Sequence, residues 1–126
     1  TPFAGRTARP DPAPGSALPR DARLDPRVAR ALARMESRLD DPEPAGDIAR
    51  ALGLSPRRLE TLFRQALGLT PAAYALTLRL QAARRLVTDT RHPMAEIALR
   101  TGFSSPATLA RAFRRQFGTA PSRLRK

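Results

Sequence analysis

Six arginines stand at helical spacing in two short segments of this sequence, with a single acid among them. They are Arg57, Arg58, Arg64, Arg111, Arg114 and Arg115. A guanidinium presents its N–H donors as a planar fork, which matches phosphate oxygens and the paired acceptors of a guanine edge. Side chains three and four residues apart share one face of a helix, so these arginines can act together. The chemistry indicated is recognition of an anion.

Residue types that perform other chemistry are scarce. The chain has no cysteine and a single histidine, His92. This composition excludes a disulfide framework, a thiol nucleophile and a zinc finger, and leaves too little for a metal site or a serine–histidine–aspartate triad. No apolar run approaches the roughly 18 residues of a membrane span, and no secretion signal opens the chain. We expect no enzyme activity, no cofactor, no membrane partner and a cytoplasmic, nucleoid-associated location.

The charge balance is strongly positive and uneven. The 126 residues hold 23 bases, all but one of them arginine, against 11 acids, which gives a net charge of +12. Residues 1–63 carry 11 bases and 9 acids, whereas residues 64–126 carry 12 bases and 2 acids. No acid follows Glu96. An imbalance of this size indicates a polyanionic partner, with nucleic acid as the first candidate.

The first 24 residues differ in kind from the rest. They contain five prolines and two glycines but only three sizeable apolar side chains. Such a stretch buries too little apolar surface to offset the entropy of ordering, so residues 1–24 are predicted to form a flexible, Pro-rich linker. Because the chain begins at Thr1 rather than Met, we expect it to be part of a longer protein.

From Asp25 onward the sequence predicts helices throughout. Four helix starts are marked by a capping residue followed by proline: Asp25-Pro26, Ser55-Pro56, Thr70-Pro71 and Ser105-Pro106. Glycines stand where helices should end, at Gly53, Gly68, Gly102 and Gly118. With the apolar periodicity, these signals predict an all-α fold of about seven helices and no sheet. The expected helices span residues 26–40, 44–52, 56–67, 71–89, 93–101, 106–117 and 121–125.

Residues 47–71 and 96–121 form an internal repeat. DIARALGL at 47–54 matches EIALRTGF at 96–103, and SPRRLETLFRQALGLTP at 55–71 matches SPATLARAFRRQFGTAP at 105–121. Each copy predicts a helix, a glycine turn and a second helix begun by Ser-Pro. This pattern is typical of a helix-turn-helix, whose second helix enters the major groove of DNA. Because two copies occur in register, a pair of DNA-binding helix-turn-helix units is favoured over ordinary helical hairpins.

The duplicated unit resembles the C-terminal DNA-binding domain of the AraC/XylS family of bacterial transcription regulators. The resemblance covers residues 25–126 and is carried by LSPRRLETLFRQALGLTPAAY and GFSSPATLARAFRRQFGTAPSRLR. It implies helix-turn-helix subdomains at 25–70 and 90–126, joined by a long connecting helix at 71–89. It also implies that the two recognition helices enter successive major grooves of double-stranded DNA.

Further partners follow only from the resemblance. It implies an effector-sensing or dimerisation domain ahead of the linker, so an effector ligand would act through that domain, and RNA polymerase is a further expected partner. The segment LPRDARLDPRVARALARMES is most similar to regulators with an amidotransferase-like sensor domain. Activation and repression both stay open.

The resemblance also assigns roles within the two recognition helices. Its base-reading positions fall at Arg57, Glu60, Thr61, Ala107, Ala110 and Arg111. Arginine can pair with guanine, glutamate can accept from cytosine, and alanine or threonine methyls can pack on thymine. Our candidates for phosphate contact are Ser55, Arg58, Arg64, Ser105, Thr108, Arg114 and Arg115. The basic tail, Arg123, Arg125 and Lys126, is expected to strengthen the second unit's grip on phosphates.

Several alternatives remain for individual side chains. Glu60 could instead pair with Arg57 or Arg64 at helical spacing. Arg79, Arg84 and Arg85 are expected to extend along apolar surface or to form ion pairs. A solvated face is predicted for Arg30, Arg34 and Arg38, and core positions for Phe63, Tyr74, Phe113 and Phe117.

Two other functions compete with sequence-specific DNA binding. With Ala107 and Ala110 in its reading positions, the second unit would also suit a non-specific architectural DNA-binding protein. A module that binds an acidic protein is the third possibility. RNA binding is disfavoured because the polar helix faces lack aromatic side chains for stacking.

Overall fold

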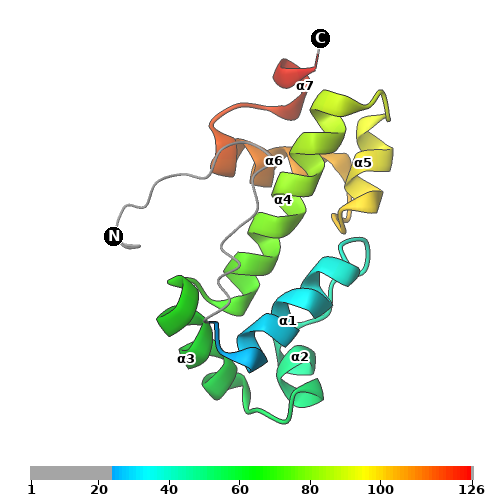
Figure 1. The fold of residues 1–126 in the computed structure, drawn as a ribbon. Coiled ribbons are helices and arrows are strands. Elements are labelled where there is room, and N and C mark those ends of the chain that lie inside the picture. The colour runs from blue at the N-terminus through cyan, green and yellow to red at the C-terminus, as the bar shows by residue number, and fades with distance from the viewer. Residues whose placement is uncertain (1–23, 126) are drawn as a thin grey trace.

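The computed structural model describes residues 24–125, which form seven helices and no strand. The helices are α1 (Pro26–Ser37), α2 (Ala45–Ala51), α3 (Pro56–Leu67), α4 (Pro71–Asp89), α5 (Met94–Arg100), α6 (Pro106–Phe117) and α7 (Pro121–Leu124). The predicted all-α class is confirmed. The pairs α2–α3 and α5–α6 are the two helix-turn-helix units, and α4 runs between them (Figure 1). The predicted linker lies outside the described residues, apart from Leu24.

Capping residues begin the helices at the predicted places. Ser55 Oγ accepts the N–H of Arg58 at 3.1 Å, and Ser105 Oγ accepts the N–H of Thr108 at 3.1 Å. Asp25 accepts both the backbone N–H and the guanidinium of Arg27, and these hydrogen bonds lower the pKa of Asp25 to about 2. The cap of α1 therefore stays charged at neutral pH, where it complements the positive end of the helix dipole.

Two separate hydrophobic cores form along the molecule. The first core comprises Val28, Ala31, Leu32, Met35, Ile48, Ala49, Leu59, Leu62, Phe63 and Tyr74. The second core comprises Leu80, Ala83, Val87, Ile97, Ala98, Phe103, Leu109 and Phe113. Because α4 supplies residues to both, one rigid helix connects them. Leu24 packs against the first core, although the composition of residues 1–24 had placed it in the predicted linker.

Several predicted helix ends were wrong by one to three residues. The helix predicted for 26–40 ends at Ser37, because Arg38 leaves the helical region with φ −135° and ψ 47°. Pro42 disfavours helical geometry at Asp41, the residue before it, which also opposes continuation of the helix through this segment. Helices α2 and α5 begin one residue late, since Pro44 and Pro93 occupy the N-cap position. The last helix ends at Leu124 with Arg125 extended.

The arginine face of α1 is only partly solvated, which corrects the prediction. Arg34 forms a two-pronged ion pair with Glu43, with nitrogen–oxygen distances of 3.0 and 2.7 Å. Arg38 binds Asp41 at 2.9 Å. The Arg34 pair therefore holds the connection between α1 and α2 against α1, and the Arg38 pair lies within that connection. Of the three predicted solvated arginines, only Arg30 makes no such pair.

Phe103 is a core residue that the sequence analysis missed. Its exposed fraction is 7%, and it lies in the second core directly after the turn of the second unit. The repeat contained the signal, because Phe103 aligns with Leu54, which packs against the first core.

We predict that Phe113→Ala destabilises the protein by about 3–5 kcal/mol, because Phe113 is fully buried and its ring lies 4.6 Å from that of Phe117. Denaturant unfolding measures the loss. Leu99→Ala is the control, since Leu99 is 67% exposed and should change stability by less than about 0.5 kcal/mol. Similar losses in both variants would contradict the assignment of the second core.

Candidate nucleic-acid interface

The interface is built on the outer faces of α3 and α6. Each helix turns its apolar side to one core, with Leu59 and Phe63 facing inward from α3 and Leu109 and Phe113 from α6. The remaining sides face solvent. Helices α3 and α6 lie beside opposite halves of α4 (Figure 1).

The base-reading candidates lie on these solvent-facing sides. Four are exposed and two are half-buried. The exposed residues are Arg57, Glu60, Ala107 and Arg111, and the half-buried residues are Thr61 and Ala110. Glu60 forms no ion pair with Arg57 or Arg64 in the described chain, so its carboxylate is open to another partner.

Three of the phosphate candidates already use their side-chain oxygens within the chain. Ser55 and Ser105 cap their helices, as described above. The hydroxyl of Thr108 lies 3.0 Å from that of Ser105 and 3.2 Å from that of Ser104. Since Pro56 and Pro106 have no N–H, the backbone N–H groups left at the two helix starts are those of Arg57 and Ala107. These amides are better placed for an anion than the serine hydroxyls.

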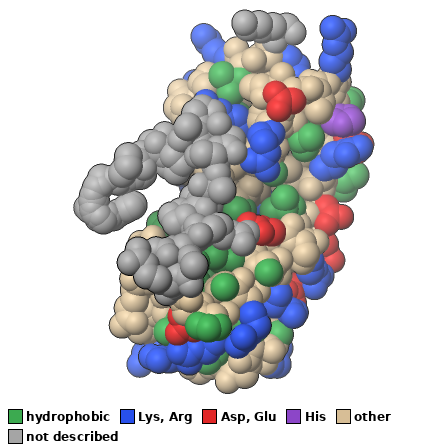
Figure 2. Space-filling view, in the orientation of Figure 1, with side chains coloured by type: hydrophobic (Ala, Val, Ile, Leu, Met, Phe, Trp, Pro, Cys, Tyr) green, Lys and Arg blue, Asp and Glu red, His purple; other side chains and the backbone are tan. Residues whose placement is uncertain are grey.

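The arginines of α3 and α6 differ from several others in the described chain. Five arginines elsewhere pair with carboxylates: Arg27, Arg34, Arg38, Arg50 and Arg100. Within residues 24–125, the six guanidinium groups of α3 and α6 have no side-chain hydrogen bond or ion pair, and all six residues are exposed. Figure 2 shows Lys and Arg side chains gathered along the lower end of the molecule, over α2 and α3. The two helices therefore present unneutralised positive charge.

The predicted role of the tail was wrong for Arg125. Its guanidinium donates to backbone carbonyls at the end of α4 and in the loop after it, including those of Thr90 at 3.1 Å and Val87 at 3.4 Å, and also that of His92. Those carbonyls lack helical partners, so an arginine satisfies them. Arg123 is exposed, and Lys126 lies outside the described residues.

Of the two alternatives predicted for the arginines of α4, Arg79 and Arg84 follow the first, because both guanidinium groups lie over apolar rings and neither forms an ion pair in the described chain. Arg79 donates to two carbonyls in the turn of the second unit and lies over the Phe103 ring at 4.4 Å. The guanidinium of Arg84 lies 4.7 Å from the centre of the Phe117 ring. Both stabilise the second unit by cation–π contact.

Comparison with known proteins identifies the family. The sequence model of a family described as a helix-turn-helix domain matches residues 48–126. The transcriptional regulator GlxA of Rhizobium meliloti is 38% identical over 115 residues, which cover 91% of this chain and 36% of that protein. The chain belongs to this helix-turn-helix family.

Solved structures agree with this assignment. An AraC-type transcriptional regulator from Chromobacterium violaceum has a TM-score of 0.75 at 38% identity, covering 79% of this chain and 89% of that one. The DNA-binding domain of AdpA, solved in complex with a target DNA, has a TM-score of 0.73 at 30% identity, covering 77% and 87%. The predicted family, fold and class of function, a DNA-binding domain of transcription regulators, are confirmed.

The chain spans about a third of the length of curated relatives such as GlxA. Within the described residues, no helix is long and apolar enough to cross a membrane. The same part of the chain contains no group of three or more His, Cys, Asp and Glu residues that could hold a metal ion.

We predict that Arg125→Ala lowers the free energy of unfolding by about 1–3 kcal/mol, because it leaves the carbonyls at the end of α4 without a donor. Arg123→Ala removes the same charge from an exposed neighbour and should leave stability nearly unchanged. Thermal unfolding compares the two variants. If Arg125→Ala had normal stability but a DNA affinity that depended less on salt, the result would support the phosphate contact first predicted for Arg125.

Proposed function

We propose that this domain binds double-stranded DNA by placing α3 and α6 in successive major grooves. The observation that carries the proposal is the set of six exposed, unpaired arginines on these two helices. Because they are unpaired, their donors are available for an external anion, whereas acids of the α1–α2 connection, α2 and α5 neutralise other arginines. The subdomains at residues 25–70 and 90–126 would contribute one recognition helix each.

The two recognition helices are proposed to differ in how much base reading and phosphate contact each provides. On α3, Arg57, Glu60 and Thr61 offer a donor fork, an acceptor and a methyl group to base edges. On α6, Ala107 and Ala110 can make only apolar contacts, so direct reading by hydrogen bonds rests on Arg111. Helix segment 105–118 carries three arginines and no acid, against three arginines and one acid in 55–68. We therefore assign more phosphate contact to α6 and more base reading to α3.

Phosphate contacts are assigned to Arg58, Arg64, Arg114 and Arg115, together with the free N–H groups at the starts of the two helices. The helix dipole adds partial positive charge at those starts. The complex of the AdpA domain with its target DNA supports the same use of this fold. In the whole protein, we propose that such binding controls transcription, with an effector acting through another domain and RNA polymerase as a partner.

The proposal is tested by selecting binding sites from a random duplex library and then adding excess random DNA at moderate salt. Sequence-specific binding survives this competition, whereas non-specific binding is lost steeply as salt rises. Failure to enrich any sequence, with binding intact at low salt, would indicate an architectural DNA-binding protein. Absence of binding even at low salt would overturn the proposed function.

We predict that Arg111→Ala relaxes the preference at one base pair of the selected site, with a loss of discrimination of about 1–3 kcal/mol. The reason is that Arg111 is the only long polar side chain in the reading positions of α6. Affinities for the selected site and for its single-base variants measure the effect. Equal losses on every sequence would contradict base reading by Arg111.

We predict that Arg114→Ala weakens binding to all sequences about equally, because phosphates are the same in every sequence. It should also flatten the slope of log affinity against log salt by about one. Titrations over a salt series measure both effects. Arg30→Ala is the matched control, since it removes one exposed charge from α1 and should leave the slope unchanged; the same change in both variants would indicate a diffuse charge effect.

A further inference from the structure

The turn of the second helix-turn-helix unit lies directly against the first half of the molecule. A Cβ atom added to Gly102 would lie 2.5 Å from the carbonyl oxygen of Leu39 and 2.8 Å from Cδ of Pro42. Both residues belong to the connection between α1 and α2. Real Cβ atoms do not approach a backbone oxygen so closely, so the contact exists only because residue 102 is glycine.

The equivalent turn of the first unit makes no such contact. Gly53 aligns with Gly102 in the repeat and has nearly the same backbone, with φ +73° against +79°. A Cβ atom on Gly53 would meet nothing within 4 Å. Both glycines therefore serve a left-handed turn, but only Gly102 also serves a close approach between two parts of the fold.

Arg79 holds the same turn from the side of α4. Its Nε donates to the carbonyl of Thr101 at 2.9 Å, and a terminal nitrogen donates to the carbonyl of Gly102 at 3.0 Å. Arg79 stands on α4 where that helix passes from the first core to the second, between Leu78 and Leu80. The turn is thus fixed to the helix that connects the two units.

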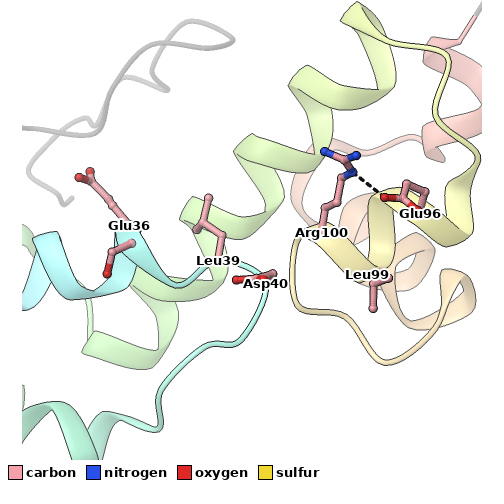
Figure 3. Close-up of a pocket in the computed structure, with 7 residues that line it drawn as sticks. Glu36, Leu39, Asp40, Glu96, Leu99 and Arg100 are labelled. Carbon is pink, nitrogen blue, oxygen red and sulfur yellow. Dashed lines mark hydrogen bonds and ion pairs between the residues drawn. The ribbon is translucent and has the colours of Figure 1, made fainter.

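The opposite side of the contact is also held in place. The ion pair of Arg34 with Glu43 attaches the α1–α2 connection to α1, and Arg38, at the start of that connection, pairs with Asp41 and Glu43 on either side of Pro42. The Arg34 guanidinium lowers the pKa of Glu43, so this pair remains charged near neutral pH. Figure 3 shows Leu39 and Asp40 at the end of α1, between α1 and α5.

We propose that Gly102 and Arg79 are positioning residues that set the distance and angle between α3 and α6. Without the contact, only α4 would relate the two units, and bending or rotation near its middle would vary their separation. With the contact, the two units are joined both through α4 and at Gly102, so the separation of α3 and α6 has one value. This inference rests on the proposed function: if α3 and α6 bind DNA, their fixed separation sets the spacing between the two half-sites that the domain accepts.

The first test measures the separation of the recognition helices without DNA. Because the chain has no cysteine, Ala66→Cys and Gln116→Cys place one spin label at equivalent exposed positions of α3 and α6. Pulsed electron paramagnetic resonance should give one narrow distance distribution for this background. Gly102→Ala should broaden or shift the distance distribution. Gly53→Ala introduces the same backbone strain in its turn and should leave the distribution unchanged. Equal distributions in both variants would overturn the proposal.

Two milder variants cover the case in which Gly102→Ala does not fold, as judged by circular dichroism. Arg79→Lys keeps the charge but loses the fork that binds two carbonyls. Pro42→Ala removes the ring atoms that approach Gly102. Each should broaden the distance distribution while the helix content stays the same. A narrow, unshifted distribution in both would overturn the role of the contact.

The second test uses DNA in which the separation of the two half-sites is changed one base pair at a time. The unaltered domain should bind best at one spacing. Gly102→Ala should shift or widen that optimum, whereas Gly53→Ala should lower affinity by a similar factor at every spacing. An unchanged optimum for Gly102→Ala would contradict the link to DNA spacing. If the unaltered domain bound no DNA, the proposed function would fail while the distance measurement still decided the contact.

Discussion

The placement of the two helix-turn-helix units depends on α4, because this helix supplies side chains to both hydrophobic cores. Tyr74 belongs to the first core, and Leu80, Ala83 and Val87 belong to the second. A helix of 19 residues is about 28 Å long, so it spans both cores without a break. Its apolar residues consequently occupy more than one face, and a displacement of α4 would disturb both cores at once.

Arginine serves three distinct purposes in this fold, and its partner decides which. Carboxylates hold Arg34 of α1, Arg50 of α2 and Arg100 of α5, so that those charges stabilise the fold and are neutralised locally. Backbone carbonyls hold Arg79 and Arg125, which act as donors at helix ends and turns. The arginines of α3 and α6 have neither kind of partner. Six unpaired, exposed arginines therefore lie on the two helices proposed to meet DNA, while Arg30, Arg85, Arg91 and Arg123 are the other exposed arginines of the described chain without a side-chain partner.

The candidate interface was largely predictable, because its residues depend on local rules. Capping by Ser55 and Ser105, the Ser-Pro starts and the apolar periodicity place the outward faces of α3 and α6 without reference to the rest of the chain. Side-chain partners were harder to predict. Arg125 and Arg111 are equally basic in the sequence, yet one binds the end of α4 and the other faces solvent. The difference arises because α7 brings Arg125 beside carbonyls that are 33 to 39 residues away in the chain.

The helices, apart from their exact ends, and the outward faces of α3 and α6 could be predicted from the sequence, since each depends on neighbours within a few turns. The repeat and the family could also be recognised there, because both follow from comparing sequence segments. Which arginines are neutralised, and how the two units meet, became known only from the packing of the helices. Gly53 and Gly102 show the distinction clearly. They match in the repeat and in backbone conformation, but only Gly102 lies against Leu39 and Pro42. No local pattern encodes that difference, because it comes from the packing of segments about 60 residues apart along the chain, which the shared helix α4 brings together.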